Sequence, residues 1–131
     1  IEAGLIEPIV KVGNLNSLRT WSDVRDAVRA YHLLLTVNPQ SGEYYNIGGN
    51  YSCTVGDMLD YLISISTHNN IKVVVDKDRL RPIDADLQLP CTEKFKNHTG
   101  WEPIIQFEKT MTDLLDFWRN KVKINNQSIV R

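Results

Sequence analysis

The pattern of hydrophobic and polar positions changes its period several times along the chain. Short apolar runs bounded by turn residues predict strands, and apolar residues spaced three and four apart predict helices. The expected elements in chain order are a strand over 8–12, a helix over 22–37, a strand over 43–47, a helix over 54–67, a strand over 71–75, a short helix over 92–100 and a last helix over 107–118. Strands that alternate with helices indicate an α/β fold.

The first predicted helix has a clear start and one apolar face. Ser22 is a suitable N-cap, and Asp23 and Asp26 place negative charge in the first turn, where the helix dipole favours it. The apolar positions predict a single buried face, made of Val24, Ala27, Val28, Tyr31, Leu34 and Leu35.

The later helices carry signals of the same kind. Thr54, followed three residues later by Asp57, resembles a capping box with Asp in place of the usual Glu. Thr92 is expected to cap the short helix, which ends at Gly100. The last helix is expected to bury one stripe, made of Phe107, Met111, Leu114, Leu115 and Trp118.

Three strands make a thin sheet, which suggests that the chain completes a larger domain. The chain starts at Ile1 without a methionine, and residues 1–5 read like the last turn of a helix ending at Gly4, so we expect a fragment of a longer protein. We expect residues 1–122 to form the folded part and residues 123–131 a polar, loose tail. An unpaired sheet edge would favour association with a second copy.

Composition and charge narrow the classes of partner. Hydrophobic residues make up 42% and charged residues 24% of the 131 residues, as in ordinary globular domains. The net charge of −1 gives no support for nucleic-acid binding, which needs clustered Lys and Arg in excess. The apolar runs are too short to cross a bilayer, and no secretory signal is visible. We therefore expect neither nucleic acid nor a membrane as a partner.

The cysteines and histidines favour a reduced, cytoplasmic protein without a metal centre. Cys53 and Cys91 lack the paired spacing of zinc or redox motifs. The three histidines are widely separated, and none has two carboxylates or thiols near it at ligand spacing.

Two arginines lie in predicted loops, where their side chains are suited to bind an anionic ligand. Arg19 is expected in the loop between the first strand and the first helix, and no acidic residue adjoins it. Arg81 opens a second loop segment that also holds Asp84. Planar guanidinium groups bind phosphate through paired hydrogen bonds. The two arginines therefore predict a bound nucleotide or another phosphorylated small molecule.

The usual signatures of a cofactor loop and of a catalytic pair are missing from the sequence. The glycines do not have the spacing of a dinucleotide-binding turn, and no tyrosine is followed four residues later by lysine. Asp84 and Asp86 are close in sequence, and a solvated loop pair explains them better than general acid–base catalysis. We therefore expect no catalysis by this chain alone.

Five short segments, weak singly, together carry a family resemblance. They are Pro8-Ile9-Val10-Lys11-Val12-Gly13-Asn14-Leu15, Arg19-Thr20-Trp21-Ser22-Asp23-Val24-Arg25-Asp26, Tyr45-Asn46-Ile47-Gly48-Gly49, Arg81-Pro82-Ile83-Asp84 and Thr99-Gly100-Trp101-Glu102-Pro103. In this order they resemble the C-terminal, substrate-binding part of an extended short-chain dehydrogenase/reductase of the NAD-dependent epimerase/dehydratase family. The similar members are the GDP-mannose 4,6-dehydratases and the GDP-6-deoxy-4-keto-mannose reductases.

The resemblance implies a Rossmann-like α/β fold that lacks its N-terminal dinucleotide-binding half. It implies that Arg19 and Arg81 bind the diphosphate of GDP-mannose or of a GDP-4-keto-6-deoxy sugar. Asp84 falls where the dehydratases have a Glu that takes ribose hydroxyls, and Asn14 falls on a strand-end loop that borders the nucleotide in similar enzymes. The N-terminal half would bring NADP and the catalytic Tyr and Lys, while the segment at Tyr45 resembles a strand of the nucleotide-fold sheet.

Two departures from the family pattern and two alternatives stay open. Thr20 stands where the family usually has Asp, and Cys91 stands where it often has Asp. The chain resembles the reductases slightly more than the dehydratases, and the residues that would distinguish these activities lie outside it. The alternative function is a non-catalytic nucleotide-sugar-binding or assembly module.

Overall fold

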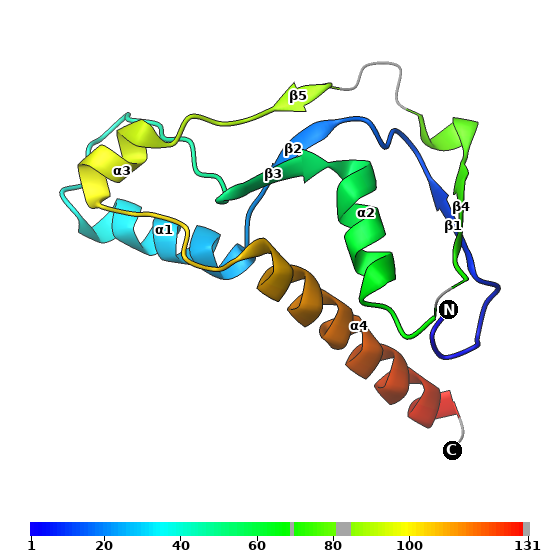
Figure 1. Ribbon diagram of the computed structural model, residues 1–131. Helices are drawn as coiled ribbons and strands as arrows, with labels where there is room; N and C mark the ends of the chain where they lie inside the picture. The colour runs from blue at the N-terminus through cyan, green and yellow to red at the C-terminus, as the bar shows by residue number, and fades with distance from the viewer. Residues whose placement is uncertain (69, 81–84, 130–131) are drawn as a thin grey trace.

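The computed structural model describes residues 1–68, 70–80 and 85–129 and has an α/β architecture (Figure 1). Its elements in chain order are β1 (Ile9–Val12), β2 (Leu18–Trp21), α1 (Val24–Thr36), β3 (Tyr51–Thr54), α2 (Val55–Ser64), β4 (Lys72–Val75), a 3₁₀ turn η1 (Lys77–Arg79), β5 (Leu87–Gln88), α3 (Glu93–Thr99) and α4 (Phe107–Ile129).

The described strands form two small sheets in place of the single thin sheet expected. Strands β1 and β4 pair in parallel, with Ile9 opposite Lys72 and Val12 opposite Val75. These two strands confirm the predictions for 8–12 and 71–75. The second sheet has the order β3-β2-β5, in which β2 is antiparallel to β3 and parallel to β5. The strand predicted over 43–47 forms no ladder, because no described strand lies beside it.

The N-cap of helix α1 lies one residue later than predicted. Its N-cap is Asp23, whose carboxylate accepts a hydrogen bond from the backbone N–H of Arg25 at 2.8 Å. The same carboxylate accepts hydrogen bonds from the Arg25 side chain and from the Thr110 hydroxyl on α4. The assignment of the cap to Ser22 was wrong, because Asp23 satisfies the helix end and joins it to α4.

The face of α1 that faces the interior differs from the predicted one. Ala30 is buried and lies in a cluster with Phe95 and Trp101. Most of the stripe predicted to be buried is open to solvent, with exposed fractions of 71% for Val24, 58% for Val28, 61% for Tyr31 and 75% for Leu35. The helix packs on α3 and the Trp101 segment through its other side, so within the described residues nothing covers this stripe.

A second core cluster joins β3 to the two longer helices. Cys53, Phe107 and Met111 are its buried members, and Met58 and Leu62 of α2 pack against them. The Tyr51 and Phe107 rings stack with centroids 4.6 Å apart. Figure 1 shows α2 lying between the two sheets and α4 running past the end of α2. This cluster therefore fixes α4 against the β3–α2 unit.

The predicted helix boundaries hold with small corrections. Thr54 accepts a hydrogen bond from the Asp57 N–H at 3.0 Å, and the Asp57 carboxylate accepts one from the Thr54 N–H, so the capping box is confirmed. Gly100 ends α3 with a φ of 72°, as the left-handed C-terminal position requires. Thr92 makes no side-chain capping bond, so its predicted capping role was wrong.

Helix α4 is longer and less buried than its pattern predicted. It continues to Ile129, so most of the stretch expected to be a loose tail is helical. Phe107 and Met111 are buried, whereas Leu114 and Trp118 are 42% and 53% exposed. The expected boundary between 1–122 and 123–131 stays a prediction.

Candidate functional site

Strand β2 places Arg19 in the middle of the three-stranded sheet. Arg19 lies opposite Cys53 of β3 on one side and Gln88 of β5 on the other. Arg19 was predicted to lie in a loop, and this prediction was wrong because two distant segments pair with both edges of β2. The strand fixes the direction in which the side chain leaves the backbone.

The Arg19 side chain reaches the segment that precedes β5. Its guanidinium donates a hydrogen bond to the Ala85 carbonyl, and the Leu18 N–H donates to the Asp86 carbonyl at 2.8 Å. Residue 85 directly follows the segment 81–84 in sequence. The predicted site residues Arg81 and Asp84 lie outside the described residues.

Asn14 shapes the turn between β1 and β2. Its amide oxygen accepts a hydrogen bond from the Asn16 N–H at 2.9 Å, and its amide nitrogen donates to the Ser17 hydroxyl at 2.9 Å. Ser17 is 1% exposed, and its carbonyl accepts from the Val55 N–H at the start of α2. Asn14 therefore holds the loop that leads into Arg19, and its contact with a nucleotide stays a prediction.

Cys53 is buried beside β2, and burial raises the pKa of its thiol, which disfavours the nucleophilic thiolate. Over residues 1–68, 70–80 and 85–125, no three His, Cys, Asp or Glu side chains gather in a way that could hold a metal ion. In the same part of the chain no helix is long and apolar enough to span a bilayer. Within the described residues, the site offers the guanidinium of Arg19, which β2 holds in position.

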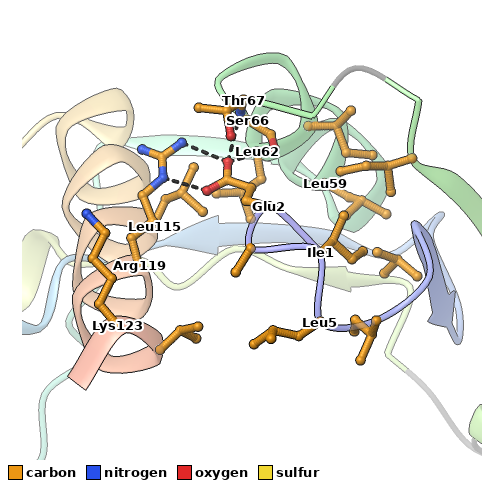
Figure 2. Close-up of a pocket in the computed structure, with 16 residues that line it drawn as sticks. Ile1, Glu2, Leu5, Leu59, Leu62, Ser66, Thr67, Leu115, Arg119 and Lys123 are labelled. Atoms are coloured by element: carbon orange, nitrogen blue, oxygen red, sulfur yellow. Dashed lines mark hydrogen bonds and ion pairs between the residues drawn. The ribbon is translucent and has the colours of Figure 1, made fainter. Parts of the chain in front are cut away.

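A groove lies away from Arg19, and it was not predicted from the sequence. It has a volume of about 760 Å³ and lies between residues 1–6, α2 and α4. Figure 2 shows the side chains that line it. Aliphatic side chains line most of it, among them Leu5, Leu59, Leu62 and Leu115. Three segments far apart in sequence build the groove, so no local pattern could have indicated it.

One end of this groove is closed by a polar network around Glu2. The Glu2 carboxylate accepts hydrogen bonds from Arg119 Nε at 2.7 Å, from the Ser66 hydroxyl at 2.7 Å and from the Thr67 N–H at 2.8 Å (Figure 2). The guanidinium of Arg119 above all, with the two other donors, holds the pKa of Glu2 well below its usual range. The network ties the N-terminal segment to α4.

Lowering the pH should weaken the interactions of Glu2 with α4, and a Glu2→Gln variant tests how much stability they contribute. Because the folded protein lowers the pKa of Glu2, its contribution to stability is present above the ordinary pKa of 4.5 and is lost as the pH falls below it. Urea titrations from pH 7 to pH 3 should show a smaller loss of stability in Glu2→Gln than in the parent chain. Glu7→Gln is the control, because Glu7 is an exposed acid on the same segment. Equal pH slopes for the parent chain and Glu2→Gln would contradict this prediction.

Comparison with known proteins identifies a family over most of the chain. The family model described as GDP-mannose 4,6 dehydratase matches residues 1–114. A dTDP-glucose 4,6-dehydratase of Salmonella typhimurium is 30% identical over 135 residues, covering 89% of this chain and 35% of the relative. A GDP-6-deoxy-D-mannose reductase of Pseudomonas aeruginosa is 24% identical over 123 residues, covering 94% of this chain and 40% of the relative.

A solved structure shares the fold. RMD from Pseudomonas aeruginosa, complexed with NADPH, superposes with a TM-score of 0.81 at 22% identity and covers 92% of this chain and 39% of that chain. The chain thus spans between a third and two fifths of the length of these relatives. Its architecture is that of a part of the Rossmann-like short-chain dehydrogenase/reductase fold. By its sequence and its fold, the chain belongs to the GDP-mannose 4,6-dehydratase family of extended short-chain dehydrogenases/reductases.

Proposed function

We propose that this chain is the nucleotide-sugar-binding part of a GDP-mannose 4,6-dehydratase or a GDP-6-deoxy-4-keto-mannose reductase. Arg19 and Arg81 bind the diphosphate, each guanidinium offering paired N–H donors to phosphate oxygens. The observation that carries the proposal is the hydrogen bond from Arg19 to the Ala85 carbonyl, because it brings Arg19 to the residue that follows the segment of Arg81 and Asp84.

The nucleoside of the ligand would contact Asp84 and the loop between β1 and β2. A carboxylate at Asp84 accepts hydrogen bonds from two ribose hydroxyls, and Asn14 borders the nucleotide from the loop that it stabilises. We propose GDP as the nucleotide and either mannose or a 4-keto-6-deoxy sugar as its partner. The family model and the reductase relative carry GDP in their names, while other relatives carry dTDP.

NADP would be bound by another part of the protein. The glycine pair of this chain does not fit a phosphate loop, because a Cβ on Gly49 would fall 1.5 Å from the Trp21 carbonyl oxygen, so this backbone is packed tightly on β2. In the described residues this glycine pair therefore packs on β2, and we do not propose it as an NADP phosphate loop. In this proposal the cofactor and the catalytic Tyr and Lys come from an N-terminal half, and the chain alone does not catalyse the reaction.

Calorimetry with GDP-mannose tests the diphosphate assignment. Arg19→Ala should weaken binding by about 10–100-fold, the loss expected for charge-assisted hydrogen bonds of 1.5–3 kcal/mol. Arg19→Lys should recover only part of it, because an ammonium group keeps the charge and loses the paired geometry. Lys121→Ala, which removes an exposed positive charge from α4, should bind like the parent chain.

Two comparisons make this test decisive. Binding of GDP-mannose that is unchanged in Arg19→Ala would refute the role of Arg19. Equal binding of dTDP-glucose and GDP-mannose would refute the choice of GDP. A chain that binds no nucleotide sugar at all would favour the alternative, an assembly module, which the exposed apolar stripe of α1 also suggests.

A further inference from the structure

The groove between residues 1–6, α2 and α4 has the size and the lining of a site for an apolar small molecule. Its volume of about 760 Å³ lies within the range of roughly 300–1,000 Å³ that is usual for ligand pockets. Figure 2 shows Leu59 on the α2 side of this space and Leu115 on the α4 side. The walls that the two helices supply are mainly aliphatic, with Leu59, Leu62, Ile63, Leu115 and Val122.

The chemistry of these walls selects a flexible aliphatic ligand over a flat ring. Among the described residues that line the groove, none has an aromatic side chain. Nucleobases and similar rings usually bind by stacking on aromatic side chains, and the groove does not provide this contact. An alkyl chain needs no directional contact, because its binding energy comes from the apolar area that it removes from water. The groove therefore suits an alkyl chain better than the base of a nucleotide.

The polar end of the groove does not call for a polar group of the ligand. All three guanidinium nitrogens of Arg119 donate hydrogen bonds, to the Glu2 carboxylate, to the Asp116 carboxylate and to the Ile65 carbonyl. The Glu2 carboxylate is held in turn by the donors described above. A ligand group placed here would have to replace hydrogen bonds that the protein already makes, which removes most of the gain in binding energy.

Lys123 supplies a positive charge at the rim of the same groove. It lies one turn of α4 beyond Arg119, lines the groove and is exposed to solvent. Among the described residues no carboxylate forms an ion pair with Lys123, whereas Lys109 pairs with Asp113 and Arg119 with Glu2. An ammonium group beside an aliphatic groove favours a ligand that joins an alkyl chain to one anionic group.

We propose that this groove is a binding site for a fatty acid, with the alkyl chain along the aliphatic walls and the carboxylate at Lys123. Arg19 is not among the residues that line the groove, so the site is separate from the one proposed for the nucleotide sugar. The inference therefore goes beyond the proposed function and does not depend on it.

Calorimetry with two fatty acids of different length tests the role of the alkyl chain. Laurate has two more CH₂ groups than decanoate, and each CH₂ group buried in an apolar site contributes about 0.8 kcal/mol. Laurate should therefore bind the 131-residue chain about tenfold more tightly than decanoate. Equal affinities for the two fatty acids would overturn the proposal, and so would the absence of binding by either one.

A charge placed in the groove tests where the chain of the fatty acid lies. Leu5 lines the groove and is 59% exposed, so Leu5→Asp should leave the protein folded, as circular dichroism can verify. This variant should bind laurate at least about tenfold more weakly, because the alkyl chain would contact a carboxylate. Leu35→Asp is the matched control, since Leu35 is exposed on α1 and does not line the groove. Unchanged binding of laurate by Leu5→Asp would overturn the proposal.

A charge reversal at the rim tests the position of the carboxylate. Lys123→Glu should weaken the binding of both fatty acids by about tenfold and keep the ratio between them, because it acts on the group that they share. Lys121→Glu makes the same charge change two residues earlier on α4, at a side chain that lies over the rings of Phe117 and Trp118 and does not line the groove. Equal effects of the two variants would refute the contact with Lys123.

Sedimentation separates the fatty acid from a second copy of the chain as the occupant. A stable dimer that Leu5→Asp dissociates and that binds no laurate would assign the groove to a second copy and overturn the proposal. All of these measurements are made without a nucleotide sugar. Binding of laurate can therefore be established even if GDP-mannose does not bind, and the two proposals fail independently.

Discussion

Asp26→Ala is expected to destabilise the chain by about 2–4 kcal/mol, because it removes a buried carboxylate that accepts three hydrogen bonds and pairs with the partly exposed Arg29. Asp26 is 1% exposed, and one carboxylate oxygen accepts hydrogen bonds from the N–H groups of Ile104 and Ile105 at 3.0 and 2.9 Å. The other oxygen accepts from Arg29 at 2.8 Å. Alanine would leave two partly buried N–H groups and one guanidinium without their acceptor.

Urea unfolding followed by circular dichroism measures this loss, and two variants control it. Asp26→Asn keeps an oxygen for the two N–H groups and turns its amide toward Arg29, so its loss should be smaller, about 1–3 kcal/mol. Asp60→Asn removes an exposed acid from α2 and should be close to neutral. Equal losses in the free energy of unfolding for Asp26→Ala and Asp60→Asn would show that the hydrogen bonds between α1 and residues 104–105 do not stabilise the chain.

Trp101→Ala is the second large effect, with an expected loss of about 3–5 kcal/mol from the cavity it leaves. Trp101 is 1% exposed and packs on Phe95, with ring centroids 5.6 Å apart. Its indole N–H donates to the Asp26 carbonyl at 3.2 Å. The variant therefore removes both the largest buried side chain and a hydrogen bond between the α3–α4 connection and α1.

Trp101→Phe separates the two contributions. Phenylalanine keeps most of the ring volume and loses the N–H donor, so it should restore a large part of the stability. Trp118→Ala is the matched control, because this tryptophan on α4 is 53% exposed. A loss in Trp118→Ala as large as that in Trp101→Ala would show that the Ala30–Phe95–Trp101 cluster is not the core of this part of the chain.

Local signals predicted the elements that depend on neighbouring residues alone. The Thr54–Asp57 capping box, the end of α3 at Gly100 and the strands near 8–12 and 71–75 all appear in the structure. A cap is satisfied within one turn, and a left-handed helix end needs only a glycine at the right place. Such features do not require knowledge of what lies across the molecule.

The wrong predictions concern residues whose structure depends on contacts with segments that are distant in sequence. Arg19 was expected in a loop because residues 18–21 are too short and mixed to indicate a strand, and the pairing comes from β3 and β5. Asp23 and Asp26 were interpreted as first-turn charges, while their bonds to Thr110 and to the 104–105 backbone cross 78 or more residues of sequence. The spacing of residues in the α1 sequence does not indicate these partners.

For the candidate site, the sequence supplied the residues and the structure supplied part of their arrangement. The pair of arginines, Asp84 and Asn14 came from motif positions, and the structure adds that Arg19 lies on a strand and reaches the Ala85 carbonyl. The role of Asn14 in holding the β1–β2 turn required coordinates, since its partners could not be ranked from sequence. Ligand binding by these residues is the proposal that calorimetry tests.

The sequence by itself determined the α/β class, the family and the amphipathic character of α1. The tertiary structure decided which side of that amphipathic helix is buried, because burial depends on which surface finds a partner. Here Ala30 meets Phe95 and Trp101, and the stripe from Val24 to Leu35 meets none within the described chain. The same reason explains residues 43–49, whose alternation is written in the sequence and whose pairing requires a neighbouring strand.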